Sequence, residues 1–133
     1  MSTIQATAGA PAAVWVRVFH NNQRTRGVYL HGYETGHTVT EVFTYTTRPQ
    51  GDTHDLALAD EAFELFNIGD DPHFGTPDPR AVDYRGRLNR SLSVGDVLAI
   101  DGRFYSCDSS GWRELTEAPP VEQITAPGTT PLY

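Results

Sequence analysis

Lysine is missing from this chain, and each of its 10 basic residues is an arginine, a bias that we attribute to a coding sequence rich in G and C. Cysteine occurs once, at Cys107, which excludes an internal disulfide framework and a zinc site built from several cysteines. No apolar run reaches the roughly 18 residues that a membrane-spanning helix needs, and the N-terminal sequence lacks the features of a secretory signal. We therefore expect a cytoplasmic protein without a membrane partner.

The charge balance is acidic, and it limits the partners that the chain can have. Its 17 acidic residues against 10 basic ones give a net charge of −7. An acidic protein repels polyanions at long range, so the composition disfavours bulk nucleic-acid binding but still allows a local basic patch. With 133 residues, 38% of them hydrophobic and 20% charged, the chain has the size and composition of a single globular domain.

The two ends of the chain differ in composition from its middle. Residues 1–12 are small and polar, and residues 116–133 are rich in Pro and Thr. We predict a flexible N-terminus over residues 1–12, a single domain over 13–115 and an extended tail over 116–133. An alternative is that the tail docks on the domain as an extended strap, through Val121, Ile124 and Leu132.

The first half of the domain has the alternating pattern of β-strands. Residues 14–20 alternate valines with Trp15, Arg17 and Phe19. Residues 38–47 are rich in threonine, valine and aromatic side chains, which favour strands. Residues 27–33 are a shorter candidate, so this pattern predicts three strands.

The periodicity then changes to that of an amphipathic helix over residues 55–67. Its apolar stripe consists of Leu58, Ala59, Ala62, Phe63, Leu65 and Phe66. Thr53 or Asp55 can cap the start, because their side-chain oxygens accept hydrogen bonds from free backbone N–H groups. After a loop rich in Pro and Gly, Asp78 and Pro79 are typical of the start of a second, short helix.

Residues 97–107 predict a β-hairpin whose two-residue loop is Asp101-Gly102. This loop sets the register of the paired strands, with Ile100 opposite Arg103, Ala99 opposite Phe104 and Leu98 opposite Tyr105. Residues 111–115 add one more short strand. The whole pattern predicts an α+β domain, in which a mainly antiparallel sheet carries the amphipathic helix and the short helix on one face.

The second half of the chain contains the segment FELFN, a Pro/Asp loop and the run YRGRLNRSLSVGDVLAIDGRFYSCDSSGWREL. Together these pieces resemble the YodL-like domain, in which an acidic helix precedes an Arg-Ser-Leu-Ser-Val core, a hairpin and a closing Gly-Trp. The likeness covers residues 58–115, and its most specific piece is residues 90–97. The resemblance implies a small non-enzymatic module found in accessory genes and mobile elements, with no catalytic residue to carry over.

Arginines and one tryptophan supply the candidate binding residues. Arg85, Arg87 and Arg90 precede Ser91 and Asp96, and guanidinium groups bind phosphates or carboxylates in a forked geometry. The favoured alternative is that these arginines, with Arg24 and Arg26, neutralise the chain's own acids, which are Asp83, Asp96, Asp60, Glu61 and Glu64. The tryptophan is Trp112, which marks a partner site if it lies exposed beside Tyr105.

No set of residues predicts a catalytic or metal centre. Asp96 has no paired acid at a telling spacing, so its carboxylate is better explained as part of a turn. The acidic loop around His73 matches no cation-loop spacing. Cys107 lies beside Asp108, whose negative charge disfavours a reactive thiolate. We therefore expect no catalytic residue, no metal and no cofactor.

These observations favour a non-enzymatic cytoplasmic module that binds a macromolecular partner, namely another protein. One alternative is a small hydrolase or nucleic-acid-modifying enzyme that uses Asp96 or His73, with Arg87 and Arg90 as anion clamps. The other alternative is a nucleic-acid-binding module, which requires a single continuous face formed by Arg24, Arg26, Arg85, Arg87 and Arg90.

Overall fold

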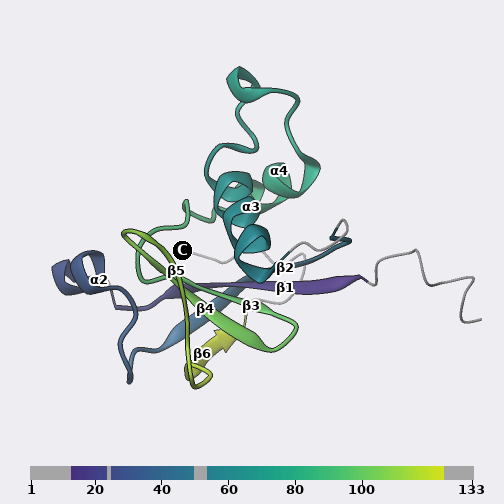
Figure 1. Cartoon of the computed structure of the whole chain (residues 1–133). Coiled ribbons are helices and arrows are strands. Elements are labelled where there is room, and N and C mark those ends of the chain that lie inside the picture. The colour runs from purple at the N-terminus through teal and green to yellow at the C-terminus, as the bar shows by residue number, and fades with distance from the viewer. Residues whose placement is uncertain (1–12, 24, 50–53, 125–133) are drawn as a thin grey trace, which may run out of the picture.

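The computed structural model describes residues 13–23, 25–49 and 54–124, which form a curled six-stranded sheet with helices packed on it (Figure 1). The elements in chain order are β1 (Val14–Asn21), α2 (Arg26–His31), β2 (Val39–Thr47), α3 (Asp55–Ile68), the 3-10 turn η1 (Pro72–Phe74), α4 (Pro79–Gly86), β3 (Val97–Ile100), β4 (Arg103–Asp108), β5 (Gly111–Glu114) and β6 (Val121–Ile124). The strand order is β5-β4-β3-β1-β2-β6, and only the β2–β6 pair is parallel. The predicted α+β class with a mainly antiparallel sheet is confirmed.

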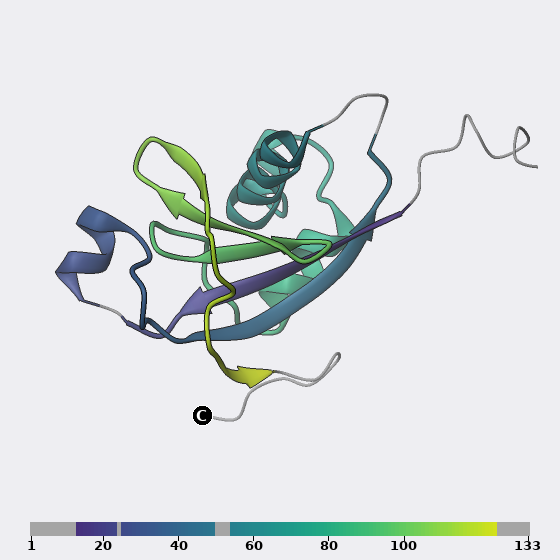
Figure 2. The same cartoon turned by 60° about the horizontal axis from the view of Figure 1, so that its bottom comes forward.

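The main core lies between the sheet and the helices α3 and α4 (Figures 1 and 2). The alternation in β1 directs Val16 and Val18 towards these helices, because successive side chains of a strand point to opposite faces. Phe19 directly follows Val18, so the same alternation turns it to the other face, where it belongs to a second, smaller cluster. The strand therefore contributes to both cores.

The buried side of α3 consists of Leu58, Ala59, Ala62, Leu65 and Phe66. Its central member is Phe66, whose ring contacts the rings of Phe43, Tyr45 and Tyr84. Tyr84 comes from α4, so this aromatic cluster joins both helices to β2. Phe63, which the sequence places in the same stripe, is instead 37% exposed and contacts the ring of Trp112 on β5.

The opposite face of the sheet carries the smaller cluster, formed by Phe19, Tyr33, Val39, Val97 and Ala99. The chain that follows β5 crosses this face on its way to β6 (Figure 2). Leu115, at the start of this crossing segment, packs against the cluster. The crossing therefore covers part of the face that carries no helix.

The predicted strand over residues 27–33 is wrong, because this segment forms the helix α2. Both edges of β1 are already paired, with β2 and with β3, so the segment that follows β1 has no place beside it where its backbone groups could pair as a strand. A helix satisfies those groups internally. Val28 is its one buried residue, and it packs so closely on Gly95 that the space for a Cβ is filled. Gly95 also has a φ of 96°, which glycine adopts most readily.

The domain continues beyond the predicted boundary at Leu115. Backbone pairing between β2 and β6 joins Val39 to Val121 and Glu41 to Ile124 in parallel register. Residues 121–124 thus dock on the domain, as in the alternative for the tail, but by backbone pairing, and the Val121 side chain is 38% exposed. A free edge on β2 explains this docking, because β6 supplies hydrogen-bond partners to that edge. The predictions for residues 1–12 and for Leu132 lie outside the described residues.

The predicted hairpin is confirmed in register and in turn geometry. Ile100 pairs with Arg103 and Ala99 with Phe104, and the loop residues Asp101 and Gly102 both have positive φ angles, of 51° and 95°. The start of α4 is also confirmed, since the side chain of its N-cap residue Asp78 accepts a hydrogen bond from the backbone N–H of Arg80. These are features that local sequence determines.

The aromatic cluster around Phe66 generates a stability prediction. Phe66 is 1% exposed, so Phe66→Ala removes a fully packed ring and should lower the free energy of unfolding by about 3–5 kcal/mol. The matched control is Phe74→Ala on η1, where the side chain is 66% exposed and a change of less than about 0.5 kcal/mol is expected. Urea unfolding followed by circular dichroism measures both, and equal losses would contradict this core.

Candidate functional site

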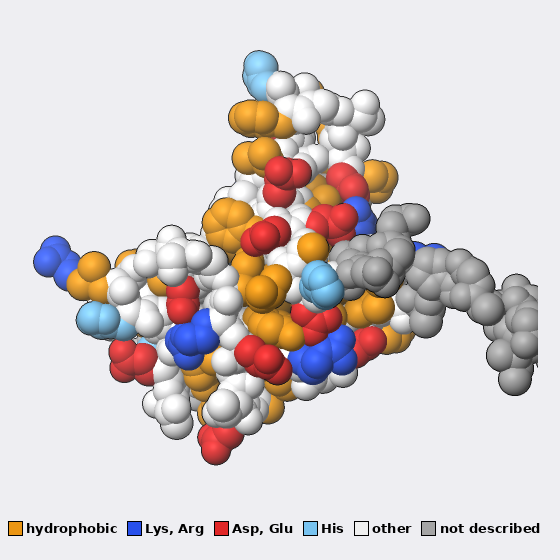
Figure 3. Space-filling view, viewed as in Figure 1, with side chains coloured by type: hydrophobic (Ala, Val, Ile, Leu, Met, Phe, Trp, Pro, Cys, Tyr) orange, Lys and Arg blue, Asp and Glu red, His pale blue; other side chains and the backbone are white. Residues whose placement is uncertain are grey.

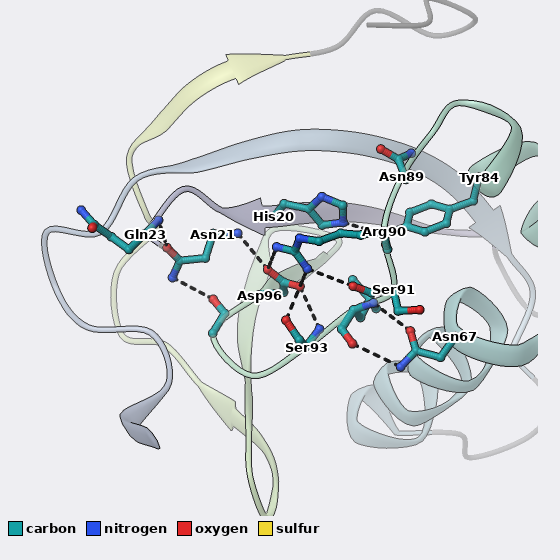
Figure 4. A network of polar contacts seen from close by, with 12 residues as sticks. His20, Asn21, Gln23, Asn67, Tyr84, Asn89, Arg90, Ser91, Ser93 and Asp96 are labelled. Carbon is teal, nitrogen blue, oxygen red and sulfur yellow. Dashed lines mark hydrogen bonds and ion pairs between the residues drawn. The ribbon is translucent and has the colours of Figure 1, made fainter. Parts of the chain in front are cut away.

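Asp96 is at the centre of a network of polar contacts, which Figure 4 shows from close by. Its carboxylate is 1% exposed and receives two hydrogen bonds from the guanidinium group of Arg90, at 2.7 and 2.8 Å. The backbone N–H groups of Ser93 and Asn21 donate to the same carboxylate, each at 2.9 Å. Both oxygens are therefore occupied by partners from the turn before β3 and from the end of β1.

The guanidinium group of Arg90 is likewise occupied by contacts within the chain. Burial disfavours its charge, but the hydrogen bonds and the charge of Asp96 outweigh this and hold the pKa of Arg90 above its ordinary value. Arg90 also donates to the carbonyl of Ser91 and to the hydroxyl of Ser93. The adjacent hollow, which Asn21 lines together with Arg90 and Asp96, has an accessible volume of about 0 Å³. The hollow beside the ion pair therefore has no room for a bound substrate, although 29% of the Arg90 side chain is exposed.

The other candidate arginines also contact the chain itself. Arg87 forms an ion pair with Asp83 at 3.0 Å, and its guanidinium group lies over the ring of Phe43. Arg85 donates to the hydroxyl of Ser91 and to the backbone carbonyl of Asn67 near the end of α3. Two of the expected internal pairs are present, Arg87 with Asp83 and Arg90 with Asp96, whereas the acid near Arg85 is Asp70 and not one of the acids predicted on α3.

Further contacts attach the segment before β3 to the helices. The Tyr84 hydroxyl donates to the carbonyl of Arg90 at 2.6 Å and lies 2.7 Å from Nε2 of His20 on β1. The side chain of Asn67 at the end of α3 donates to the carbonyl of Leu92 and accepts from the N–H of Leu92. The conspicuous arginine and serine block therefore fixes the chain path between α4 and β3.

The remaining candidate, Trp112, lies in a different place, on the side of the sheet that carries α3. It lines an open hollow of about 630 Å³ between the start of α3 and the strands β4 and β5. The lining residues are His54, Asp55, Leu56, Arg103, Tyr105, Trp112 and Glu114. In the space-filling view, hydrophobic side chains lie between charged ones over α3 and the strands below it (Figure 3).

A charged group at the start of α3 forms one wall of this hollow. Arg103 donates to both oxygens of Asp55, at 2.5 and 3.0 Å, and the Tyr105 hydroxyl donates to the same carboxylate at 2.5 Å. The bond from Arg103 is the main reason that the pKa of Asp55 lies below its ordinary value. Burial, followed by the hydrogen bond to Asp55, raises the pKa of Tyr105 to about 12. Both groups therefore titrate far from neutral pH.

The same contacts correct the predicted cap of α3. Asp55 lies inside the first turn, and its carboxylate bonds to β4 instead of to the backbone at the start of the helix. The N-cap residue is His54, whose side chain forms no capping bond. The other predicted cap, Thr53, lies outside the described residues. Asp55 thus forms a tertiary ion pair with Arg103 in place of the predicted local capping hydrogen bond.

The apolar part of the hollow comes from α3 and β5. Trp112 is partly buried against the main core, and its ring lies 6.4 Å from that of Phe63 in an edge-to-face arrangement. Leu56 is 50% exposed. Sequence reasoning selected Trp112 with Tyr105 and missed Leu56, Asp55 and Arg103, since nothing local signals that residues 48 positions apart will meet.

The proposed reactive groups do not converge. His73 is exposed on η1, where its backbone N–H and its ring Nδ1 contact the carboxylate of Asp71 and not that of Asp96. Burial raises the pKa of the Cys107 thiol to about 12, and the charges of Asp96 and neighbouring acids add to this effect. Within residues 13–23, 25–49 and 54–124, no group of three or more acidic, histidine or cysteine residues is arranged to hold a metal ion. None of the helices in these ranges has the length and apolar character that a membrane crossing requires.

Comparison with known proteins gives one informative relationship. The chain is similar to the uncharacterised protein R785 of Acanthamoeba polyphaga mimivirus, with 30% identity over 76 residues. This alignment covers 57% of the present chain and 68% of the viral protein. No family model matches the chain, and no solved structure matches it.

The Asp96 network generates a prediction about stability. Asp96→Asn removes the charge of a fully buried carboxylate and leaves the partly buried guanidinium group of Arg90 without its counter-charge, so it should lower the free energy of unfolding by about 3 kcal/mol. The matched control is Asp83→Asn, because this carboxylate is 51% exposed in its pair with Arg87 and should contribute less than about 1 kcal/mol. Urea unfolding at pH 7 compares the two, and similar small losses would show that Asp96 is not a structural centre.

The lowered pKa of Asp55 generates a pH prediction. A carboxyl group with a depressed pKa in the folded state stabilises the fold above its unfolded pKa of about 3.9, and this contribution is lost as the pH falls through the lower folded value. The stability difference between wild type and Asp55→Asn should therefore be present at neutral pH and should shrink on acidification below about pH 4. Unfolding curves at several pH values measure it, and a difference independent of pH would contradict the contribution of the Asp55 charge.

Proposed function

This chain belongs to one family with the uncharacterised protein R785 of Acanthamoeba polyphaga mimivirus, and we propose that it is a small non-enzymatic accessory module that binds another protein. The binding site is the hollow between the start of α3 and the strands β4 and β5. The observation that carries the proposal is the partly exposed Trp112, which sits in this hollow beside Tyr105.

The composition of the hollow is that of a protein-binding surface. Trp112 and its neighbour Phe63 provide aromatic area, and Leu56 is half exposed beside them. Aromatic side chains surrounded by a polar rim are the residues that contribute most to protein association. The hollow is also wide and open, whereas sites for small molecules enclose most of the ligand surface.

The acid-base properties of the hollow support a binding role over catalysis. A general acid or base works best with a pKa near the working pH. The pKa of Asp55 is shifted downwards and that of Tyr105 is raised to about 12, so both move away from neutrality. The enzyme alternative built on Asp96 and Arg90 lacks space for a substrate, since the accessible volume beside them is about 0 Å³.

The nucleic-acid alternative has less support. It requires free arginines on one face, but Arg85, Arg87 and Arg90 each contact an acid of the same chain. Arg26 lies on α2, which stands beyond one end of the strands and apart from α3 and α4 (Figures 1 and 2), and Arg24 lies outside the described residues. The net charge of −7 opposes polyanion binding as well.

The proposal also includes the resemblance of residues 58–115 to the YodL-like domain, with the cytoplasmic location and accessory or mobile-element role that it implies. In this proposal α3 acts as an amphipathic helix with two apolar surfaces. The larger surface, with Phe66, faces the core; in the smaller one, Leu56 lines the hollow and Phe63 contacts the ring of Trp112. The short helix α4 packs on the core through its buried residues Ala81 and Tyr84 and has no part in the proposed binding site.

The two tryptophans of the chain make the binding site directly testable. Trp15 is 57% exposed, and it projects from the opposite face because its neighbours Val14 and Val16 pack on the main core. In a Trp15→Phe variant, Trp112 is the one remaining tryptophan, so its emission should shift to shorter wavelength when a partner covers the hollow. A protein captured by the immobilised full chain from a cell lysate serves as the titrant.

Three variants complete this experiment. Trp112→Ala should weaken binding of the captured protein by about 2 kcal/mol or more, as expected for an aromatic anchor, and Trp15→Ala should leave it unchanged. A Trp112→Phe variant, which retains Trp15, should show no emission shift on binding. Circular dichroism establishes that each variant is folded. A captured protein whose binding depends on Trp15 and not on Trp112 would overturn the proposal.

A further inference from the structure

The strand β5 forms one edge of the sheet, next to the hollow. It pairs with β4 on one side, and the described residues contribute no strand on the other side. Three of its four residues are exposed, and Trp112 is partly buried. The edge of the sheet and the proposed binding site thus share one element.

The register of β5 indicates which of its backbone groups point outwards. Leu115 donates its N–H to the carbonyl of Phe104, so these two residues form a hydrogen-bonded pair of the antiparallel ladder. Such pairs alternate with pairs that are not hydrogen-bonded to each other. The Tyr105–Glu114 and Cys107–Trp112 pairs are therefore of the second kind. The N–H and C=O groups of Trp112 and Glu114 consequently face away from β4.

The side chains of the same two residues point towards the hollow. Trp112 and Glu114 are two positions apart on the strand, so their side chains lie on one face, and both line the hollow. Arg113, between them, points to the other face and donates to the carbonyl of Tyr33. A strand added to this edge would therefore place alternate side chains against Trp112 and against Glu114.

The charges around the hollow select for a basic partner. Glu114 is exposed, and its charge reaches the hollow, where it contributes to the raised pKa of Tyr105. Asp60 is exposed on α3, and its charge contributes to the raised pKa of Cys107, the residue that pairs with Trp112. Arg103, which lines the hollow, is already bound to Asp55. Among the described residues that line the hollow, the charge of Glu114 therefore has no matching arginine.

We propose that the partner binds by adding a strand to β5, as an extended segment in which an apolar side chain and a Lys or Arg alternate on the face towards the hollow. This inference rests on the proposed function, because it uses the same hollow. The apolar side chain packs on Trp112, and the basic side chain, two positions away in the segment, pairs with Glu114. Main-chain hydrogen bonds to Trp112 and Glu114 supply affinity, and the alternation supplies specificity.

A second copy of this chain fits the edge less well. Each copy has a net charge of −7, so two copies repel each other. The acidic rim would also meet another acidic rim.

The test uses a library of random dodecapeptides displayed on phage, selected on the immobilised full chain. Enriched peptides are synthesised and titrated into the Trp15→Phe variant, with Trp112 emission as the signal. Peptides that support the inference carry an apolar and a basic residue two positions apart. Such a peptide can be N-methylated at its odd-numbered or at its even-numbered residues. One of these two patterns should abolish binding and the other should preserve it, because only alternate N–H groups of an added strand face β5.

Two substitutions of Glu114 distinguish the contribution of its main-chain N–H to binding from the contribution of its charge. Glu114→Pro removes an outward N–H without breaking the ladder to β4, and should weaken peptide binding by about tenfold. Glu114→Gln retains this N–H and removes the charge, so it should cause a smaller loss of about threefold that disappears at high salt. Urea unfolding establishes that both variants retain the fold, and the N-methylated peptides test the same contact in the unaltered protein.

The possible results distinguish this inference from the proposed function. Peptides that depend on Trp112 but tolerate Glu114→Pro and both N-methylation registers would overturn strand addition and leave the hollow as the binding site. Enriched peptides whose binding does not depend on Trp112 would overturn both strand addition and the proposed binding site in the hollow. Sedimentation of the chain as a dimer that Glu114→Pro dissociates would overturn the inference in favour of a second copy.

Discussion

The packing of α3 over the sheet is the contact on which both the core and the candidate binding site depend. Phe66 and its buried neighbours occupy the space between α3, α4 and the strands. Because the helix is round and the sheet is curled, residues at the margin of the same apolar stripe cannot reach the core. Phe63 is at this margin and meets Trp112 at the edge of the sheet. The hollow is therefore a direct result of how one helix lies on one sheet.

The most conspicuous sequence block of the chain has a different role. The arginines and serines before β3 bind to Asp96, to Asp83 and to backbone carbonyls, and they guide the chain from α4 into the sheet. A carboxylate as deeply buried as that of Asp96 requires such a set of donors, since burial of an unpaired charge is costly. Charged residues such as these could be taken for reactive groups. Here their ion pairs and hydrogen bonds hold the turn before β3 in place.

Local signals in the sequence predicted the local structure well. The Asp-Gly loop determined the register of β3 and β4, and Asp78-Pro79 determined the start of α4, because in both cases neighbouring residues satisfy the backbone. The segment that became α2 was mispredicted, because its short alternation fits a strand and only the occupied edges of β1 exclude one. The docking of β6 depends on the free edge of β2, which is likewise a property of the assembled sheet.

The candidate site could be predicted only in part, for the same reason. Trp112 and Tyr105 could be associated from the hairpin and the next strand, which are contiguous in sequence. Asp55 and Arg103 meet only after α3 has packed on β4, and the sequence placed Asp55 in a helix cap instead. The exposure of Leu56 and Phe63 depends on where the edge of the sheet lies beneath the helix. Sites formed at the margin of tertiary packing carry no local signature.

Hydrogen exchange of the backbone amides, measured with and without the captured protein, tests the central claim most directly. The account predicts that protection on binding is concentrated at the start of α3 and along β5, the two elements that border the hollow. Protection confined to α2, or to the opposite face around Trp15, would contradict it.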